Sequence, residues 1–351
     1  MANLGSRRIN MRTVTFAVLA LLITPAVERA GLTSEQNARS SAPYQSINLL
    51  RVSLLLFAPA RANVHRTASQ FRKSIIDPYQ EIFRVAPGST NEQTLEDFFR
   101  SDENLETYIQ SSSSHELAMR KLSDEFPTLL SACWSRLHRR LPRLHGDVTI
   151  FLLPAPLDTV GGCVRPVARR NVVVFGSEVI AHRLESRLRF DVFVSHELFH
   201  LYHLQVNPET RNVTSGYFMH DMNPPPPKLY QLMWLEGLAV HASQILNPHA
   251  TMNEAWVSKD PITEVEARVQ QLSALALEEL DSTDKEMIRN LVFDGNETRG
   301  IPSGTGYYVG MLVAKHLASH YRLENLADLK GGALRDAVKG ELSQIATYRS
   351  D

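Results

Sequence analysis

The residues whose types and spacing could do chemistry together lie in the stretch His196-Glu197-Leu198-Phe199-His200. Residues four apart lie on the same face of an α-helix, one turn apart and within about 6 Å of each other. Two imidazoles placed in this way can bind one Zn²⁺ between them. Glu197 directly follows the first histidine, and its carboxylate could take a proton from a water molecule held at that metal. The pattern predicts a zinc site with a general base beside it.

The residues around this motif predict that it lies inside the protein. The segment from Phe190 to Tyr202 has helical length and is apolar on nearly every side. Burying two histidines and a glutamate is costly unless other groups compensate them. A metal ion with its bound water would supply that compensation. The alternative is a set of core polar residues satisfied by hydrogen bonds alone.

A second stretch, Trp234 to Ser243, predicts a helix that supplies a third ligand. Glu236, Ala239 and Ser243 are spaced to share one helix face, and two small side chains beside a carboxylate suit close packing against another helix. Glu236 would complete a His, His, Glu set and leave a fourth metal position open, as in catalytic zinc sites. Without the first motif, Glu236 would be interpreted as a surface residue of an amphipathic helix.

The two motifs together resemble those of the gluzincin metallopeptidases, in which a glutamate on a second helix follows His-Glu-x-x-His as the third ligand. The stretch Trp234 to Ala239 is similar to the Trp-Leu-Asn-Glu-Gly-x-Ala sequence of the aminopeptidase branch, with the Asn missing. With Gly306 to Gly310, the chain also resembles predicted bacterial zinc-dependent proteases of unknown substrate, over roughly residues 147–320. The resemblance implies zinc-dependent peptide hydrolysis, with ligands His196, His200 and Glu236 and base Glu197.

Two features depart from the family pattern. The segment between His200 and Glu236 is longer than usual, and the excess lies in 206–229, where four consecutive prolines predict an extended loop. In thermolysin-like members, an aspartate four residues after the ligand glutamate supports a zinc-binding histidine, but Val240 stands at that position here. Another group must therefore orient the histidines.

The resemblance also implies a hydrogen-bond donor for the oxyanion that forms on the scissile carbonyl, from the chain after the third ligand. Tyr307 is the first candidate, because the glycines at 304, 306 and 310 would let this segment approach a neighbouring backbone closely. Tyr308 is the second candidate, since one residue along a helix turns the side chain by about 100°. Both could instead be half-buried packing residues.

Two histidines close to the two motifs, and both cysteines of the chain, are not expected to bind the metal. His203 is on the same helix face as His196 but about 10 Å farther along the axis, so we expect it to pack or to support the ligands. His241 should point away from the face that carries Glu236. Cys133 and Cys163 lack zinc-like spacing, and whether they form a disulfide stays open.

Around the site we expect an α+β fold that is mainly helical. Two runs rich in β-branched residues, Asp147 to Leu153 and Asn171 to Phe175, predict a small mixed sheet before the metal-binding helix, with a loop containing 161–163 between them. The resemblance implies that one strand pairs with the substrate backbone, and a purely structural strand is the alternative. Residues 63–351 are expected to form one unit, with a helical N-terminal part at 63–146, a sheet and zinc-site core at 147–250 and a helical C-terminal part at 251–351.

Residues 1–62 have the features of a leader region. Arginines precede the apolar run Val14 to Ile23, which is too short to span a membrane comfortably. A second apolar run, Leu49 to Ala60, ends at the small-x-small site Ala60-Arg61-Ala62. The pattern predicts export, to the periplasm or out of the cell, with no integral membrane span after leader removal. A mitochondrial transit peptide is the alternative, because the region is rich in arginine and poor in acidic residues.

The composition is that of an ordinary globular protein, with 351 residues of which 43% are hydrophobic and 21% charged. The formal net charge of −1 gives no electrostatic reason to expect nucleic acid as a partner. The expected partner is a peptide or protein substrate, and the sequence does not define the oligomeric state. The alternative function is a non-catalytic exported envelope protein that retains the metallopeptidase fold; the intact base Glu197 argues against it.

Overall fold

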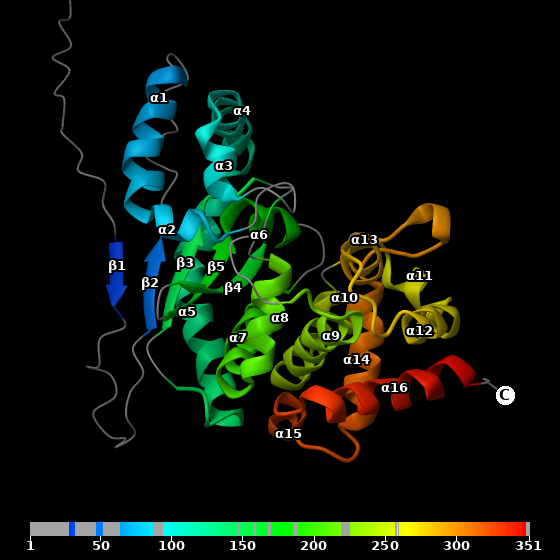
Figure 1. Ribbon diagram of the computed structural model, residues 1–351. Coiled ribbons are helices and arrows are strands. Elements are labelled where there is room, and N and C mark those ends of the chain that lie inside the picture. Colours follow the sequence, from blue (N-terminus) through cyan, green and yellow to red (C-terminus); the bar gives the residue numbers. More distant parts are fainter. Residues whose placement is uncertain are drawn as a thin grey trace, which may run out of the picture.

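The computed structural model describes residues 28–31, 47–51, 64–86, 94–145, 148–156, 159, 161–167, 170–184, 189–218, 225–256, 258 and 260–348. These residues form a mainly helical α+β fold, in which a small mixed sheet precedes the helix of the His-Glu-x-x-His motif and helices make up the C-terminal part (Figure 1). The fold class expected from the sequence is thus confirmed. Within the described residues, the structure contains no helix with the length and apolarity needed to cross a membrane.

The sheet has five strands in the order β1-β2-β3-β5-β4. Its pairings are antiparallel for β1 (Glu28–Gly31) with β2 (Ile47–Arg51), parallel for β2 with β3 (Val148–Leu153) and for β3 with β5 (Arg170–Gly176), and antiparallel for β5 with β4 (Gly162–Val167). The two runs rich in β-branched residues form β3 and β5, as predicted. Strands β1 and β2 lie within 1–62, where the sequence predicts a leader and no strand.

The loop expected at 161–163 is a wrong prediction, because β4 begins at Gly162 and forms the edge of the sheet. An edge strand needs ladder hydrogen bonds on one side only. It therefore tolerates a glycine and Pro166, both of which weaken the strand pattern in the sequence. The consequence for the site is that β4 packs directly against the helix that carries the histidines.

Helices and helical turns between β2 and β3 cover one face of the sheet. They are α1 (Val64–Phe71), the turns Arg72–Ile76 and Asp77–Tyr79, α2 (Gln80–Phe83), α3 (Leu95–Arg100) and α4 (Asp102–Ser112). A further turn, Ser113–His115, leads into the long helix α5 (Glu116–Arg140), which packs on the other face. Alternate residues of the strands point to opposite faces. Phe151 and Val174 thus join the core of the N-terminal helices, while Ile150 and Val173 join the larger core around α5.

The chain after β5 is helical. Its elements are α6 (Ser177–Leu184), α7 (Phe190–Val206), α8 (Pro208–Phe218), α9 (Leu229–Leu246), α10 (Met252–Ala255), α11 (Ile262–Glu266), α12 (Val269–Glu278), α13 (Lys285–Arg289), the turns Asn290–Asp294 and Glu297–Arg299, α14 (Thr305–Leu317), α15 (Leu323–Ala327) and α16 (Gly331–Thr347). Helix α9 packs against both α7 and α14, and these three helices form the centre of the larger core.

The extended loop predicted across 206–229 is wrong over the length of α8. The side-chain oxygen of Asn207 accepts a hydrogen bond from the Glu209 backbone N–H at 3.1 Å, which caps the start of this helix. Pro208 stands at its first position, where the missing N–H of proline costs nothing. The four consecutive prolines exclude helix only locally, and 225–228 have no regular structure.

Cys133 and Cys163 are both free and buried, so the structure contains no disulfide between them. Cys133 lies in the larger core with α5, and Cys163 lies in the core of the N-terminal helices. Burial raises the pKa of both thiols, and that of Cys163 reaches about 11. Both cysteines therefore act as small apolar core residues.

Candidate metal centre

Helices α7 and α9 are apolar on nearly every side, so most of the polar residues in their central turns are buried as well. Nearly the whole of each helix lies inside the larger core. His196, His200 and Glu236 are 4%, 8% and 6% exposed. Polar side chains buried this deeply need partners, and here they become one another's partners.

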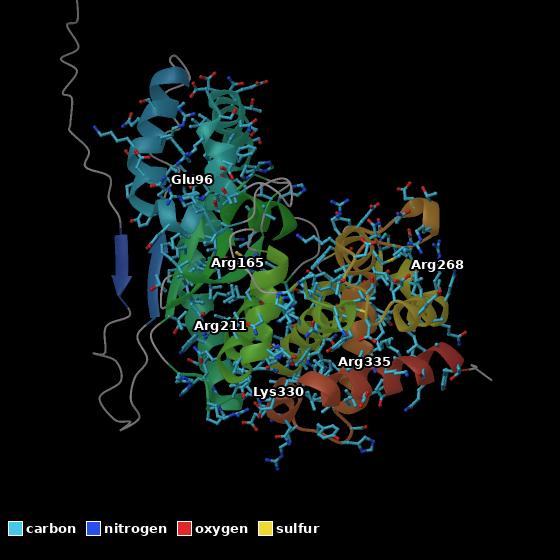
Figure 2. The ribbon with its side chains drawn as sticks, in the orientation of Figure 1. Glu96, Arg165, Arg211, Arg268, Lys330 and Arg335 are labelled. Atoms are coloured by element: carbon cyan, nitrogen blue, oxygen red, sulfur yellow. The ribbon has the colours of Figure 1, made fainter. Side chains whose placement is uncertain are left out.

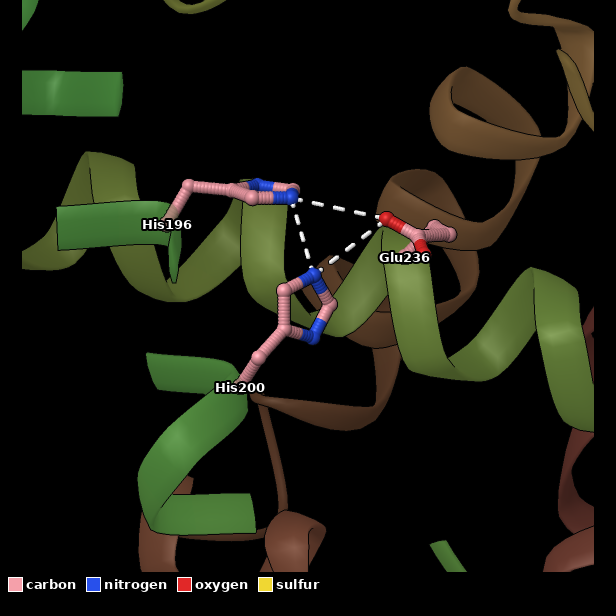
Figure 3. Close-up of side chains that lie close together, drawn as sticks. All are labelled: His196, His200 and Glu236. Atoms are coloured by element: carbon pink, nitrogen blue, oxygen red, sulfur yellow. Dashed lines mark hydrogen bonds and ion pairs between the residues drawn. The ribbon is translucent and has the colours of Figure 1, made fainter. Parts of the chain in front are cut away.

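The three predicted ligands converge between the two helices (Figure 3). The Nε2 atoms of His196 and His200 are 3.0 Å apart, and Oε2 of Glu236 lies 3.4 Å from the first and 3.3 Å from the second. The candidate ligand atoms all lie within 4.8 Å of one another. Among the described residues this is the one group of three or more His, Cys, Asp or Glu side chains with such geometry.

The donor set fits a divalent metal ion of the zinc type. Two imidazole nitrogens and one carboxylate oxygen are the ligands of many catalytic zinc sites. Burial alone would raise the pKa of Glu236, but His200 and His196 lower it below its usual range through their charges and hydrogen bonds. Glu236 is thus held as a carboxylate, the form that binds a metal.

One imidazole nitrogen of the candidate site lacks a hydrogen-bond partner among the described residues. This nitrogen is Nδ1 of His200, which is buried. Val240, which stands where thermolysin-like sequences carry an aspartate, is apolar and fully buried. The described residues therefore provide no protein group that orients His200 through Nδ1, in agreement with the departure noted in the sequence.

Glu197 lies on the same helix and faces the edge of the sheet. Its side chain is 5% exposed and lies against the backbone of Gly162 at the start of β4. The negative charge of Glu197 is close enough to this strand to contribute to the raised pKa of Cys163, after the larger effect of burial. The sequence pattern indicates a loop at 161–163, so it gives no sign that Gly162 lies next to Glu197.

Gly310 in α14 and Gly237 in α9 bring these two helices into backbone contact. A Cβ atom at Gly310 would lie 2.1 Å from the carbonyl oxygen of Met233, and one at Gly237 would lie 2.1 Å from the carbonyl carbon of Gly310. Only glycine on both helices permits this crossing. The close approach predicted from the glycines is confirmed, and its partner on α9 is the residue that follows Glu236.

This crossing distinguishes the two tyrosine candidates. The ring centroid of Tyr307 lies 6.2 Å from that of His196, with an angle of 32° between the rings. Tyr308 lies on another side of α14, where its hydroxyl donates to Oε1 of Glu266 at 3.2 Å. Burial and the Glu266 charge raise the pKa of Tyr308 to about 12. Of the two, Tyr307 is the one beside the candidate ligands.

The other two histidines are buried outside the ligand group. Burial, together with the nearby His200, lowers the pKa of His203 to about 3. Burial, together with the charge of Lys315, lowers the pKa of His241 to about 4. Both imidazoles are therefore neutral at physiological pH, and neither is part of the metal group found among the described residues.

None of the protein-family models, curated proteins or solved structures compared with this chain matches it. The candidate metal centre consequently rests on the chemistry and geometry of its own residues.

Proposed function

We propose that this protein is a zinc-dependent peptidase of the gluzincin type, with His196, His200 and Glu236 as the ligands of one Zn²⁺. The observation that carries the proposal is the convergence of these three donors at 3.0–3.4 Å inside an apolar core. Burying an anionic carboxylate and two imidazoles is costly, and a bound metal ion would compensate for that cost. The adjacent Glu197 supports a catalytic function over a structural metal.

The chain's own residues would share the steps of amide hydrolysis. A bound zinc ion would supply Lewis acidity toward the scissile carbonyl and toward water. The carboxylate of Glu197 would accept a proton from the attacking water as the water oxygen bonds to the carbonyl carbon. It would then give that proton to the amine nitrogen as the C–N bond breaks.

Tyr307 is the proposed donor to the carbonyl oxygen as negative charge develops there. Its ring lies beside His196 on a helix that glycines press against α9, so its backbone has little freedom to move. A donor that is positioned in advance stabilises the charged transition state without reorganisation. Tyr308 does not suit this role, because its hydroxyl is directed to Glu266.

The reaction is tested by digesting a broad peptide library with zinc-replete protein and identifying new termini by mass spectrometry. The proposal expects cleavage that stops when a chelator removes the metal and returns when zinc is added. Zinc-loaded, folded protein that cleaves no peptide would favour the non-catalytic alternative.

We also propose that the protein is exported, on the basis of the leader-like residues 1–62. Cleavage after Ala62 would give a mature chain that starts near Asn63 and lacks β1 and β2. Strand β3 would then lose its parallel partner β2. N-terminal sequencing of protein from its native host tests this proposal, and an intact Met1 in the cytosolic fraction would contradict it.

A further inference from the structure

The side chain of Glu197 occupies the space that any side chain at position 162 would need. A Cβ atom at Gly162 would lie 2.7 Å from Cγ of Glu197 and 2.8 Å from both Cδ and Oε1. Carbon atoms in contact are normally about 3.5–4.0 Å apart. The three heavy atoms nearest to that Cβ all belong to Glu197, so Glu197 is the residue that a side chain here would meet first.

The backbone at Gly162 does not itself require glycine. Among the described residues, the glycines with a positive φ are Gly295, Gly300, Gly304 and Gly331, and Gly162 is not one of them. In a strand, glycine is unfavourable because it gains no packing and loses more chain entropy than other residues. The close approach of the Glu197 side chain is the feature that accounts for a glycine here.

Strand β4 is held in place and cannot easily move aside. Its ladder with β5 runs from Gly162 opposite Phe175 to Val167 opposite Arg170. Just before the strand, the Gly161 carbonyl accepts a hydrogen bond from the Gly176 backbone N–H at 3.0 Å. The buried Arg165, which is labelled in Figure 2, donates to the Val85 carbonyl. This bond ties the strand to the segment after α2.

We propose that Gly162 is a positioning residue for Glu197: the absence of a side chain at the start of β4 leaves the space that the Glu197 carboxyl group occupies and so sets its location. The proposal rests on the proposed function, because it assigns Glu197 as the base. A methyl group at position 162 would displace the end of the Glu197 side chain, since the strand and the buried helix α7 are the more rigid partners. The three atoms nearest to this methyl group belong to Glu197 and not to the candidate metal ligands.

The packing part is tested by a thermal double-mutant cycle. Gly162→Ala should lower the Tm by at least about 2 °C in the wild-type background. The same change should cost little in a Glu197→Ala background, because that variant lacks Cγ, Cδ and Oε1. If Gly162→Ala alone does not fold, a folded, zinc-binding double variant supports the proposal. Equal Tm losses in both backgrounds would overturn it.

The positioning part is tested by zinc content and kinetics. Zinc-loaded Gly162→Ala should keep the wild-type zinc content and KM and lose about 10²-fold in kcat, the cost of misplacing a reacting group by about 1 Å. In a Glu197→Gln background the same change should cause no further loss. Gly340→Ala is the matched control, because its added Cβ meets no atom within 4 Å.

The two parts separate failure of this inference from failure of the proposed function. If zinc-loaded wild-type protein cleaves no peptide, the proposed function fails, while the thermal cycle still decides whether Glu197 and residue 162 compete for one space. If wild-type protein is active and folded Gly162→Ala retains full kcat, the positioning role is wrong and the function stands.

Discussion

Glu236 and Glu178 are two of the almost fully buried glutamates among the described residues, and their surroundings shift their pKa values in opposite directions. Glu236 faces two imidazoles, whose charges and hydrogen bonds hold its pKa below the usual range in spite of burial. Glu178 in α6 faces neutral donors. The Tyr108 hydroxyl donates to Oε1, and the Ala155 N–H and the Ser177 hydroxyl donate to Oε2 at 2.9 and 2.7 Å. Burial outweighs these bonds and raises the pKa of Glu178.

The difference shows that partners decide what a buried carboxyl can do. Glu236 remains anionic next to groups that can share a metal, so it is suited to be a ligand. Burial shifts the pKa of Glu178 upward, and its hydrogen bonds tie α6 to α4 and to the segment after β3, which indicates a structural role. Burial alone is therefore a poor guide to the site.

The largest expected effect concerns a third buried glutamate, the proposed base. Glu197→Gln should lower kcat by about 10²- to 10⁴-fold, because an amide cannot accept the proton of the attacking water. Zinc content should stay at the wild-type level. The control is Glu178→Gln, which makes the same chemical change in the structural glutamate and should leave kcat unchanged. Equal losses in both variants would show that the effect is not specific to the site.

The second effect concerns the tyrosines on α14. Tyr307→Phe should cost about 10²-fold in kcat with little change in KM, because it removes one donor to the oxyanion. Tyr308→Phe should stay near wild type, since that hydroxyl is bonded to Glu266. Steady-state kinetics of both variants, with their zinc content measured in parallel, tests this difference in kcat. Full activity in Tyr307→Phe would exclude Tyr307 as the donor.

The third effect concerns the glycine crossing that holds α14 beside the site. Gly310→Ala would place a methyl group 2.1 Å from the Met233 carbonyl oxygen and should lower the free energy of unfolding by about 1–3 kcal/mol. Gly340 also lies in a helix, but a Cβ added there meets no atom within 4 Å. Gly340→Ala should therefore leave the free energy of unfolding unchanged or raise it slightly. Denaturant unfolding of both variants makes the measurement. A stable Gly310→Ala would contradict the close crossing of α9 and α14.

The smallest effect is a pH dependence of stability at Glu178. Its folded pKa is raised above the ordinary value of 4.5, so its contribution to stability is fully present below that pH and is lost as pH rises through the folded pKa. Gln at this position can bond to the same three partners and does not titrate. The unfolding free energy of Glu178→Gln should therefore improve relative to wild type as the pH rises from the ordinary value toward the raised folded pKa. A difference independent of pH would contradict the raised pKa.

The parts of the site that follow from local spacing could be predicted from the sequence. His196 and His200 share a face because helix geometry places residues four apart together, and buried apolar surroundings were readable from the residues themselves. The glycines around Tyr307 indicated a close backbone approach. The strands β3 and β5 were visible as runs of β-branched residues.

The parts that depend on contacts distant in sequence could not be predicted. Nothing in the sequence pairs Gly310 with Gly237, or Gly162 with Glu197, because each pair meets only after the helices and the sheet have packed. Strand β4 was missed since an edge strand tolerates residues that obscure its pattern. Helix α8 does not follow from the sequence pattern, because the four consecutive prolines after it indicate an extended loop for the whole of 206–229.

The central claim is that Glu236 and its two histidines, and not burial as such, create a metal site. The most direct test is elemental analysis of wild-type protein, Glu236→Gln and Glu178→Gln after zinc-replete purification. We expect about one zinc per chain in wild type and in Glu178→Gln, and loss of zinc in Glu236→Gln. Wild-type protein without zinc, or zinc retained equally in all three, would contradict the account.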